Sequence, residues 1–129
     1  MSTATRFRSA ILGLPGGSAL YGSRVFAKKA PDDLAGAVWL VLDRVSNTTG
    51  AAHDGGGGMS DTLVQVTVGG GDLAQVEEVK DFLLENLNGY EYTDVSGSIT
   101  VLHEGDSDDY DEETRVYTAP ITFRILDNN

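Results

Sequence analysis

Alternating apolar and polar residues predict several β-strands along this chain. The alternation is clearest over residues 61–68, where three valines occupy every second position, and it recurs over residues 98–103 and 114–126. Residues 37–45 are instead apolar almost without interruption, which is typical of a strand buried on both faces. A further short strand is predicted over residues 24–26. The pattern therefore predicts a sheet built from strands in both halves of the chain.

Helical spacing of apolar residues predicts two helices. In residues 3–21 and again in residues 73–88, apolar side chains recur every three or four positions. Pro15 and the two glycines after it end the first helix early, because proline and glycine interrupt helical structure. The second helix has Asp72 as its predicted N-cap and Gly89 just after its end.

The predicted elements follow one another in the order α-β-β-β-α-β-β, which favours an α+β fold. The expected architecture is a mostly antiparallel sheet of four to five strands with two helices on one face. Pro120 lies inside the last predicted strand and has no N–H to donate to a ladder hydrogen bond. It therefore predicts a bulge or an outer edge at that point of the sheet.

Two polar segments interrupt the regular pattern. The chain has 129 residues, which fits a single domain over residues 1–129. Residues 104–113 carry seven acids in ten positions and are predicted to form an acidic loop. Residues 46–60 are predicted to form a long mobile loop that includes four consecutive glycines: Gly55, Gly56, Gly57 and Gly58.

The composition excludes several classes of protein and site. The chain has no cysteine, which excludes disulfides, thiolate zinc sites, iron–sulfur clusters and cysteine nucleophiles. The apolar run at residues 37–42 is far shorter than the roughly 20 residues that a membrane-spanning helix needs. The N-terminal apolar stretch is too short for a signal peptide. We therefore expect an unprocessed cytoplasmic protein with no membrane partner.

Charge is distributed unevenly along the chain. The net charge is −11, yet residues 1–30 contain no acid. An acidic body of this kind should not bind nucleic acid tightly, because phosphate binding depends on positive charge. We expect the basic segment to meet an acidic surface, such as that of a neighbouring copy. Its five basic residues are Arg6, Arg8, Arg24, Lys28 and Lys29.

Neither the glycine-rich nor the acidic segment matches a ligand-binding motif. A phosphate-binding loop needs Gly-Lys-Ser/Thr before a helix, whereas the residues after Gly58 enter a predicted strand. If an EF-hand calcium loop began at Asp106, its required glycine and glutamate would be Asp111 and Tyr117. The acidic segment stays open to three interpretations: a solvated loop, a weak divalent-cation site, or a charged face that serves an assembly.

The two histidines, His53 and His103, do not complete a catalytic constellation. A triad of Ser107, His103 and Asp106 is conceivable, but neighbouring residues on one strand point to opposite faces, and no nucleophile elbow is present. We therefore expect no catalytic residue, no metal and no cofactor. This profile favours a binding or structural protein over an enzyme.

Short motifs spread over almost the whole chain carry a resemblance to a known family. They are LYGSRVF at residues 20–26, Ala30-Pro31, VWLVLDRVS at residues 38–46, LVQVTV at residues 63–68, DDYDEETRVY at residues 108–117 and ITFRI at residues 121–125. Together they resemble the tail-terminator, or tail-completion, family of long-tailed bacteriophages. Members of that family open with a short helix, a Gly-x-Arg-Val/Ile-Tyr/Phe strand and an x-Ala-Pro turn.

The resemblance implies a structural virion protein and not an enzyme. Members of the family form a ring, usually a hexamer, that caps the finished tail tube and meets the head–tail connector. The implied partners are further copies of the chain, the tail tube protein, and the connector or a head-closure protein. DNA passes through such a ring without specific binding. The implied location is the tail–neck region of the virion, after assembly in the host cytoplasm.

The resemblance and the charge pattern together predict contact residues. Subunit or partner contacts are expected at Arg6, Arg8, Arg24, Lys28, Lys29, His53, Gly55, Gly56, Gly57 and Gly58. An acidic face on the channel or the rim of the ring is expected at Asp106, Asp108, Asp109, Asp111, Glu112 and Glu113. Two other functions remain open: another neck component such as a head-closure protein, and an oligomeric domain that binds a small ligand.

Overall fold

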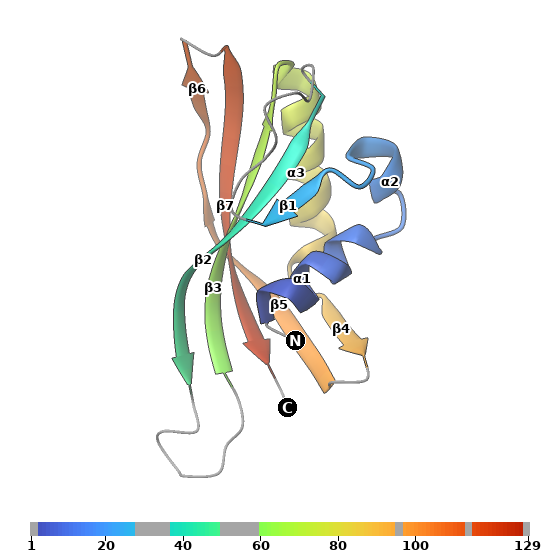
Figure 1. Cartoon of the computed structure of the whole chain (residues 1–129), viewed down its shortest axis with the longest axis vertical. Helices are drawn as coiled ribbons and strands as arrows, with labels where there is room; N and C mark the ends of the chain where they lie inside the picture. Colours follow the sequence, from blue (N-terminus) through green and yellow to red (C-terminus); the bar gives the residue numbers. More distant parts are fainter. Residues whose placement is uncertain (1–2, 28–36, 50–59, 95–96, 113–114, 128–129) are drawn as a thin grey trace.

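The protein has an α+β fold in the computed structural model (Figure 1), which confirms the predicted class. Within the described part of the chain, seven strands form one sheet and three helices lie against it. The structure describes residues 3–27, 37–49, 60–94, 97–112 and 115–127.

The sheet is mostly antiparallel, as predicted. Its strand order is β1-β2-β3-β7-β5-β4, with β6 beside β7, and β1–β2 is the parallel pair. The expected number of four to five strands is too low, because the short, polar strands β4 and β6 have no hydrophobic alternation to reveal them. The strands are β1 (Val25–Ala27), β2 (Trp39–Thr49), β3 (Ser60–Gly70), β4 (Glu91–Asp94), β5 (Gly97–Asp106), β6 (Asp109–Asp111) and β7 (Val116–Asp127).

Three helices cover one face of this sheet: α1 (Thr3–Leu12), α2 (Gly17–Leu20) and α3 (Leu73–Leu87) (Figure 1). The first helix ends early, as predicted, since α1 stops at Leu12, before Pro15. The short helix α2 was not predicted; it follows Gly16, which adopts a left-handed conformation with φ of 87°. The N-cap of α3 is as predicted, since the Asp72 carboxylate accepts a 2.9 Å hydrogen bond from the Ala74 N–H. None of the described helices is long and apolar enough to cross a membrane.

The hydrophobic core lies between the helices and the face of the sheet that they cover. The predicted alternation is confirmed, because Val64, Val66 and Val68 of β3 are fully buried there while the residues between them are half-exposed. Tyr21 is buried in the core beside α1, where its hydroxyl donates a 2.7 Å hydrogen bond to the Ile11 carbonyl. Burial raises the pKa of Tyr21 to about 12. The buried stripe of α3 consists of Val76, Val79, Leu83 and Leu87.

The opposite face of the sheet, here called the outer face, carries none of the three described helices (Figure 1). Its half-exposed side chains include Trp39, Val41, Leu63 and Leu126. The Trp39 indole lies across Gly69 of the neighbouring strand, where an added Cβ atom would overlap the ring. Glycine at position 69 therefore lets an aromatic ring lie flat on the outer face.

Both segments predicted as loops are partly strand. In the first, Ser46–Thr49 extend β2 and Ser60 begins β3, while residues 50–59 lie outside the described residues. In the second, residues 104–106 belong to β5 and Asp109–Asp111 form β6. The acidic segment forms strand because the long strand β7 offers hydrogen-bond partners to its backbone, although its side chains favour water.

Pro120 lies at a break in the pairing of β7 and not at an edge of the sheet. Strand β7 has β3 on one side and, on the other, β5 and then β6. The Pro120 carbonyl accepts a 3.0 Å hydrogen bond from the Ser107 N–H, and Ser107 lies between β5 and β6. The missing N–H of Pro120 thus falls where β7 exchanges one partner strand for the next, so no ladder donor is lost.

Candidate assembly surfaces

Arg6, the first of the five basic residues, forms ion pairs within its own chain. Its guanidinium lies 3.2 Å from the Asp94 carboxylate and 3.0 Å from the Asp127 carboxylate, and its side chain is 1% exposed. These three residues are here called the Arg6 cluster. Burial acts to lower the pKa of Arg6, but the hydrogen bonds and charges of the two carboxylates outweigh it and raise the pKa. The expectation of a subunit contact at Arg6 is corrected, because the side chain has no free surface and joins α1 to β4 and β7.

Arg8 and Arg24 stay half-exposed and bind backbone carbonyls around β1. The Nε of Arg8 donates a 2.7 Å hydrogen bond to the Val25 carbonyl. The Nε of Arg24 donates a 2.6 Å hydrogen bond to the Val38 carbonyl, and one of its Nη atoms donates at 3.4 Å to Leu20. Because β1 is an edge strand, these two arginines place positive charge along that edge of the sheet.

A groove of about 270 Å³ opens beside Arg24, between α2, the start of β2 and α3. Its apolar walls are made by residues such as Ala19, Leu20 and Val79. Polar groups reach it from Arg24 on one side and from Gln75 and Glu78 of α3 on the other. The groove is thus lined mainly by polar atoms, with a smaller apolar area beside one cationic and one anionic group.

The β6–β7 hairpin carries three residues of the predicted acidic face: Asp109, Asp111 and Glu112. Lys80 of α3 holds its base, because the Nζ atom lies 2.8 Å from the Asp106 carboxylate and 3.0 Å from that of Asp108. The hydrogen bond from Lys80 lowers the pKa of Asp106, and the charges of Lys80 and His103 lower it further. Asp109 and Glu112 are exposed.

Tyr110 is the large apolar side chain of this hairpin that faces water. Its ring stacks on Tyr117 of the paired strand, with 4.5 Å between the ring centroids, and the residue is 42% exposed. An exposed tyrosine among carboxylates is typical of a contact residue, since tyrosine is enriched at protein interfaces. The hydrophobic pattern of the sequence does not single it out, because its neighbours are all acidic.

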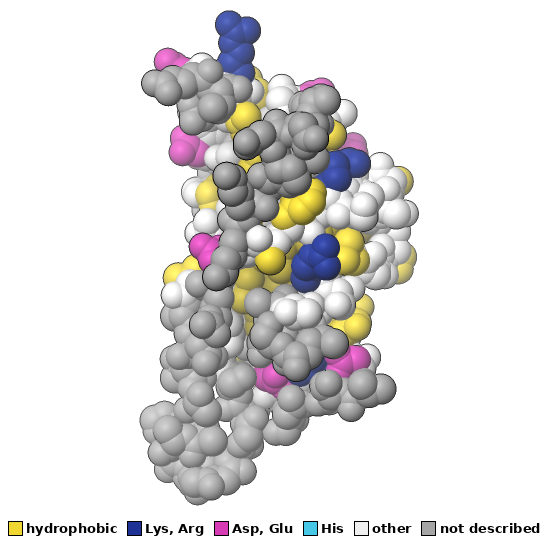
Figure 2. Space-filling model, viewed as in Figure 1, with side chains coloured by type: hydrophobic (Ala, Val, Ile, Leu, Met, Phe, Trp, Pro, Cys, Tyr) yellow, Lys and Arg dark blue, Asp and Glu magenta, His cyan; other side chains and the backbone are white. Residues whose placement is uncertain are grey.

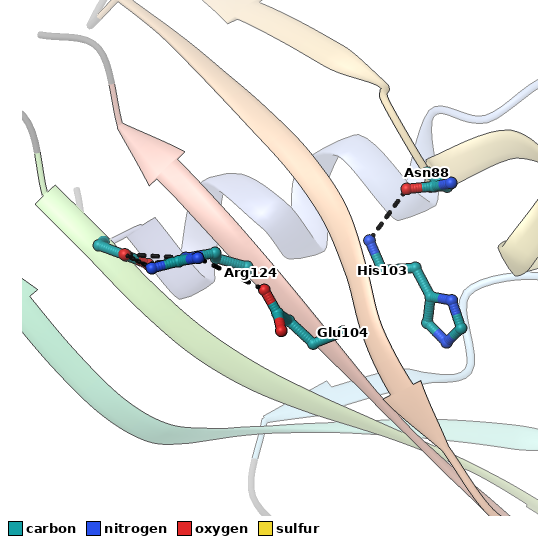
Figure 3. Close-up of polar contacts among 5 residues, drawn as sticks. Asn88, His103, Glu104 and Arg124 are labelled. Carbon is teal, nitrogen blue, oxygen red and sulfur yellow. Dashed lines mark hydrogen bonds and ion pairs between the residues drawn. The ribbon is translucent and has the colours of Figure 1, made fainter.

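His103 lies at a bulge of β5, near the base of the hairpin (Figure 3). Its backbone N–H donates a 3.0 Å hydrogen bond to the Asn88 side chain, just beyond α3. Its Nε2 atom lies 3.0 Å from the Asp106 carboxylate, although the angles fall short of a hydrogen bond. Strand alternation alone predicts opposite faces for His103 and Asp106. The register shift between His103 and Gly105 instead turns both to the same face.

A second arginine cluster lies on the outer face of the sheet (Figure 3). The Arg124 guanidinium donates from Nε at 2.8 Å to Asp61 on β3, and its Nη1 atom lies 3.6 Å from Glu104 on β5. The side chains of Arg124 and Glu104 are 46% and 42% exposed. This Arg124 cluster links three neighbouring strands across a surface that no described helix covers.

On the face shown in Figure 2, the Lys and Arg side chains lie apart from one another and form no continuous basic patch. Among the described residues, no three His, Asp or Glu side chains come together in a way that could hold a metal ion. Several expected contact residues fall outside the described part of the chain: Lys28, Lys29, His53, Gly55, Gly56, Gly57, Gly58 and Glu113. Of Asp111, the structure describes the backbone in β6.

Comparison with known proteins gives a likeness of fold. No protein-family model and no curated protein matches this sequence. A chain of a solved virion has the same fold. It comes from the virion of a native gene transfer agent (GTA) particle, and the two chains agree with a TM-score of 0.75 at 17% sequence identity. The likeness covers 98% of this chain and 96% of that chain, so it concerns the whole fold and not a single motif.

Proposed function

We propose that this protein is a structural protein of a phage-like virion and, more specifically, a tail terminator. Copies of the chain close into a ring, expected to be a hexamer, that caps the tail tube. One side of the ring binds the tail tube protein, and the other side binds the head–tail connector or a head-closure protein. The protein acts by binding and not by catalysis, needs no cofactor, assembles in the host cytoplasm and stays in the tail–neck region of the virion.

The observation that carries this proposal is the likeness of fold to a chain of the GTA virion. That likeness extends over 98% of this chain, although the two sequences share 17% identity. The motifs that resemble the tail-terminator family fall on the same framework, since they cover parts of β1, β2, β3 and β7. Two independent comparisons, one of sequence motifs and one of folds, thus favour a phage-like virion.

The surfaces of the protomer also favour self-assembly. The outer face has half-exposed apolar side chains, the β6–β7 hairpin exposes an aromatic ring, and a groove opens beside Arg24. The net charge of −11 on each copy suits a ring through which DNA slides, because an acidic passage repels phosphates and retains no DNA.

The size and shape of the purified protein test the proposal. We expect light scattering at low salt and micromolar concentration to give a closed oligomer, and negative-stain images to show rings. When isolated tail tubes are added, the rings should cap one end of each tube. Rings that form only on the tube also support the proposal. A monomer that fails to bind tail tubes as well contradicts it.

The same preparation separates a tail terminator from another neck component. A tail terminator should bind finished tail tubes that carry no head, whereas a head-closure protein should bind filled heads and leave free tubes uncapped. Images of the protein mixed with each of the two particles, prepared separately, decide between these functions. The mixture without added protein is the matched control for each particle.

A further inference from the structure

We infer that Tyr110 on the β6–β7 hairpin of one copy inserts into the Arg24 groove of the next copy, as the repeated contact of an oligomer. This inference rests on the proposed self-assembly and deepens it, because it assigns both sides of one subunit contact. The occupant of the groove is thus a second copy of this chain.

The hairpin has the properties of an inserting element. Tyr110 is 42% exposed, and its ring is held in place by stacking on Tyr117 at 4.5 Å. The salt bridges of Lys80 with Asp106 and Asp108 fix the base of the hairpin to α3. A rigid aromatic side chain loses little conformational entropy on binding, which makes it a suitable anchor for an interface.

The groove has the properties of the matching cavity. Its volume is about 270 Å³, and apolar atoms of Leu20 and Val79 line it. Arg24 uses its Nε and one Nη atom on backbone carbonyls, and its Nη1 atom makes no hydrogen bond with the described part of the chain. A carboxylate from outside can therefore accept a hydrogen bond from Nη1.

Charge complementarity identifies the acidic hairpin as the occupant. Glu112 follows the end of β6 directly and is exposed, so the hairpin presents a carboxylate close to Tyr110. When the tyrosine ring enters the groove, this carboxylate approaches the edge strand with Arg8 and Arg24. The tyrosine hydroxyl can donate a hydrogen bond to the Glu78 carboxylate, which gives that anion a partner inside the groove.

The positions of the two elements make the contact intermolecular. Lys80 contacts the hairpin and Glu78 lines the groove, and side chains two residues apart on an α-helix point about 160° away from each other. Figure 1 accordingly shows the hairpin and α2 on opposite sides of α3. A protomer therefore cannot fill its own groove. A contact between two different surfaces repeats from copy to copy, and it closes a ring when the rotation permits.

Cross-linking tests the contact directly, because the chain has no cysteine of its own. The double variant Ala19→Cys/Tyr110→Cys places one thiol on the wall of the groove and one on the hairpin. Under mild oxidation we expect a ladder of disulfide-linked oligomers on a gel without reductant, since a disulfide needs Cα atoms within about 7 Å. The matched control is Ala19→Cys/Asn86→Cys, with the second thiol on an exposed position of α3 away from the hairpin.

A second variant measures how much the Tyr110 side chain contributes to oligomer formation. Tyr110→Ala should keep the circular dichroism spectrum of the parent protein and raise the concentration at which half of the protein is oligomeric by at least about tenfold. Val45→Ala, at another exposed apolar residue, should leave that concentration unchanged.

The two proposals fail in different ways. If the reduced protein forms rings but the double variant cross-links no better than its control, the contact is wrong and the tail-terminator function stands. If Tyr110→Ala and Val45→Ala assemble equally well, the contact is wrong as well. If the unmodified protein is a monomer with and without tail tubes, the proposed function fails and the contact fails with it.

Discussion

The two arginine clusters use the same chemistry in opposite surroundings. In each, one guanidinium meets two carboxylates from other strands or helices. In the Arg6 cluster the arginine side chain is 1% exposed, and its partners lie 88 and 121 positions away in the sequence. In the Arg124 cluster the arginine is 46% exposed, and it lies on the outer face of the sheet. Burial, and not the number of ion pairs, is therefore what separates these two clusters.

Burial changes the value of an ion pair because water competes with the partner. A buried charge that loses its partner stays desolvated, and breaking such a pair costs about 3–5 kcal/mol. An exposed pair contributes little, since water and salt screen both charges. Lys80 lies between these limits, with 12% of its side chain exposed, while its partner Asp106 is 30% exposed. The exposure of the basic side chain thus increases from Arg6 to Lys80 to Arg124.

The largest effect is expected at Arg6. Arg6→Met should lower the free energy of unfolding by about 3 kcal/mol or more, because Asp94 and Asp127 both lose the buried guanidinium that they contact. Urea denaturation followed by circular dichroism measures this change.

A triple variant identifies the cause of that loss. Arg6→Met/Asp94→Asn/Asp127→Asn also removes the two carboxylate charges and should recover part of the lost stability. If the triple variant is no more stable than Arg6→Met, the loss comes from the packing of the long arginine side chain and not from its charge. The two clusters would then differ in how tightly the arginine side chain is packed, and not in the effect of burial on its charge.

An intermediate effect is expected at Lys80. Lys80→Met should lower the free energy of unfolding by about 1 kcal/mol at pH 7, and this loss should depend on pH. The pKa of Asp106 is lowered in the folded protein, so its contribution is present above the unfolded value of about 3.9. It is lost as the pH falls through the folded pKa, which lies below that value.

Urea midpoints measured from pH 7 down to pH 3 check this dependence. The difference between the parent protein and Lys80→Met should shrink in acid, because protonated Asp106 no longer pairs with Lys80. His103, the other neighbour of Asp106, is present in both proteins, so it does not account for a difference between them. A difference that stays constant down to pH 3 would show that Lys80 stabilises the fold by packing alone.

The smallest effect on stability is expected at Arg124. Arg124→Met should leave the urea midpoint unchanged within error, because its partners Asp61 and Glu104 return to water. Arg124→Lys serves as the control, since it keeps the charge and loses the paired geometry with Asp61. A loss as large as that of Arg6→Met would mean that exposure does not separate the two clusters.

The sequence predicts most of the fold because the fold depends on local patterns. Valines at every second position predict β3, and the apolar spacing after Asp72 predicts α3. The strands β4 and β6 escape prediction, because their residues are polar and their pairing depends on β5 and β7. The bulge beside His103 is equally hidden, since no local signal marks the register shift that turns Asp106.

The candidate surfaces are harder to predict than the fold. Arg6 lies in a run of basic residues that is typical of a solvated face, yet it is buried by partners from the opposite end of the chain. Nothing near Arg6 in the sequence indicates Asp94 or Asp127. The groove beside Arg24 arises from α2, β2 and α3 together, so it exists only after tertiary packing. Charge counts along the sequence therefore could not predict which basic residues are buried and which stay at the surface.

The indole of Trp39 lies flat on Gly69, and it belongs to the sole tryptophan of the chain. When the protein is excited at the long-wavelength edge of its absorption, its fluorescence therefore comes from this one indole. That ring is half-exposed on the outer face, away from the core that the helices cover. Its emission wavelength depends on how much water contacts this indole, so the unlabelled protein contains an optical probe of the outer face, which none of the described helices covers.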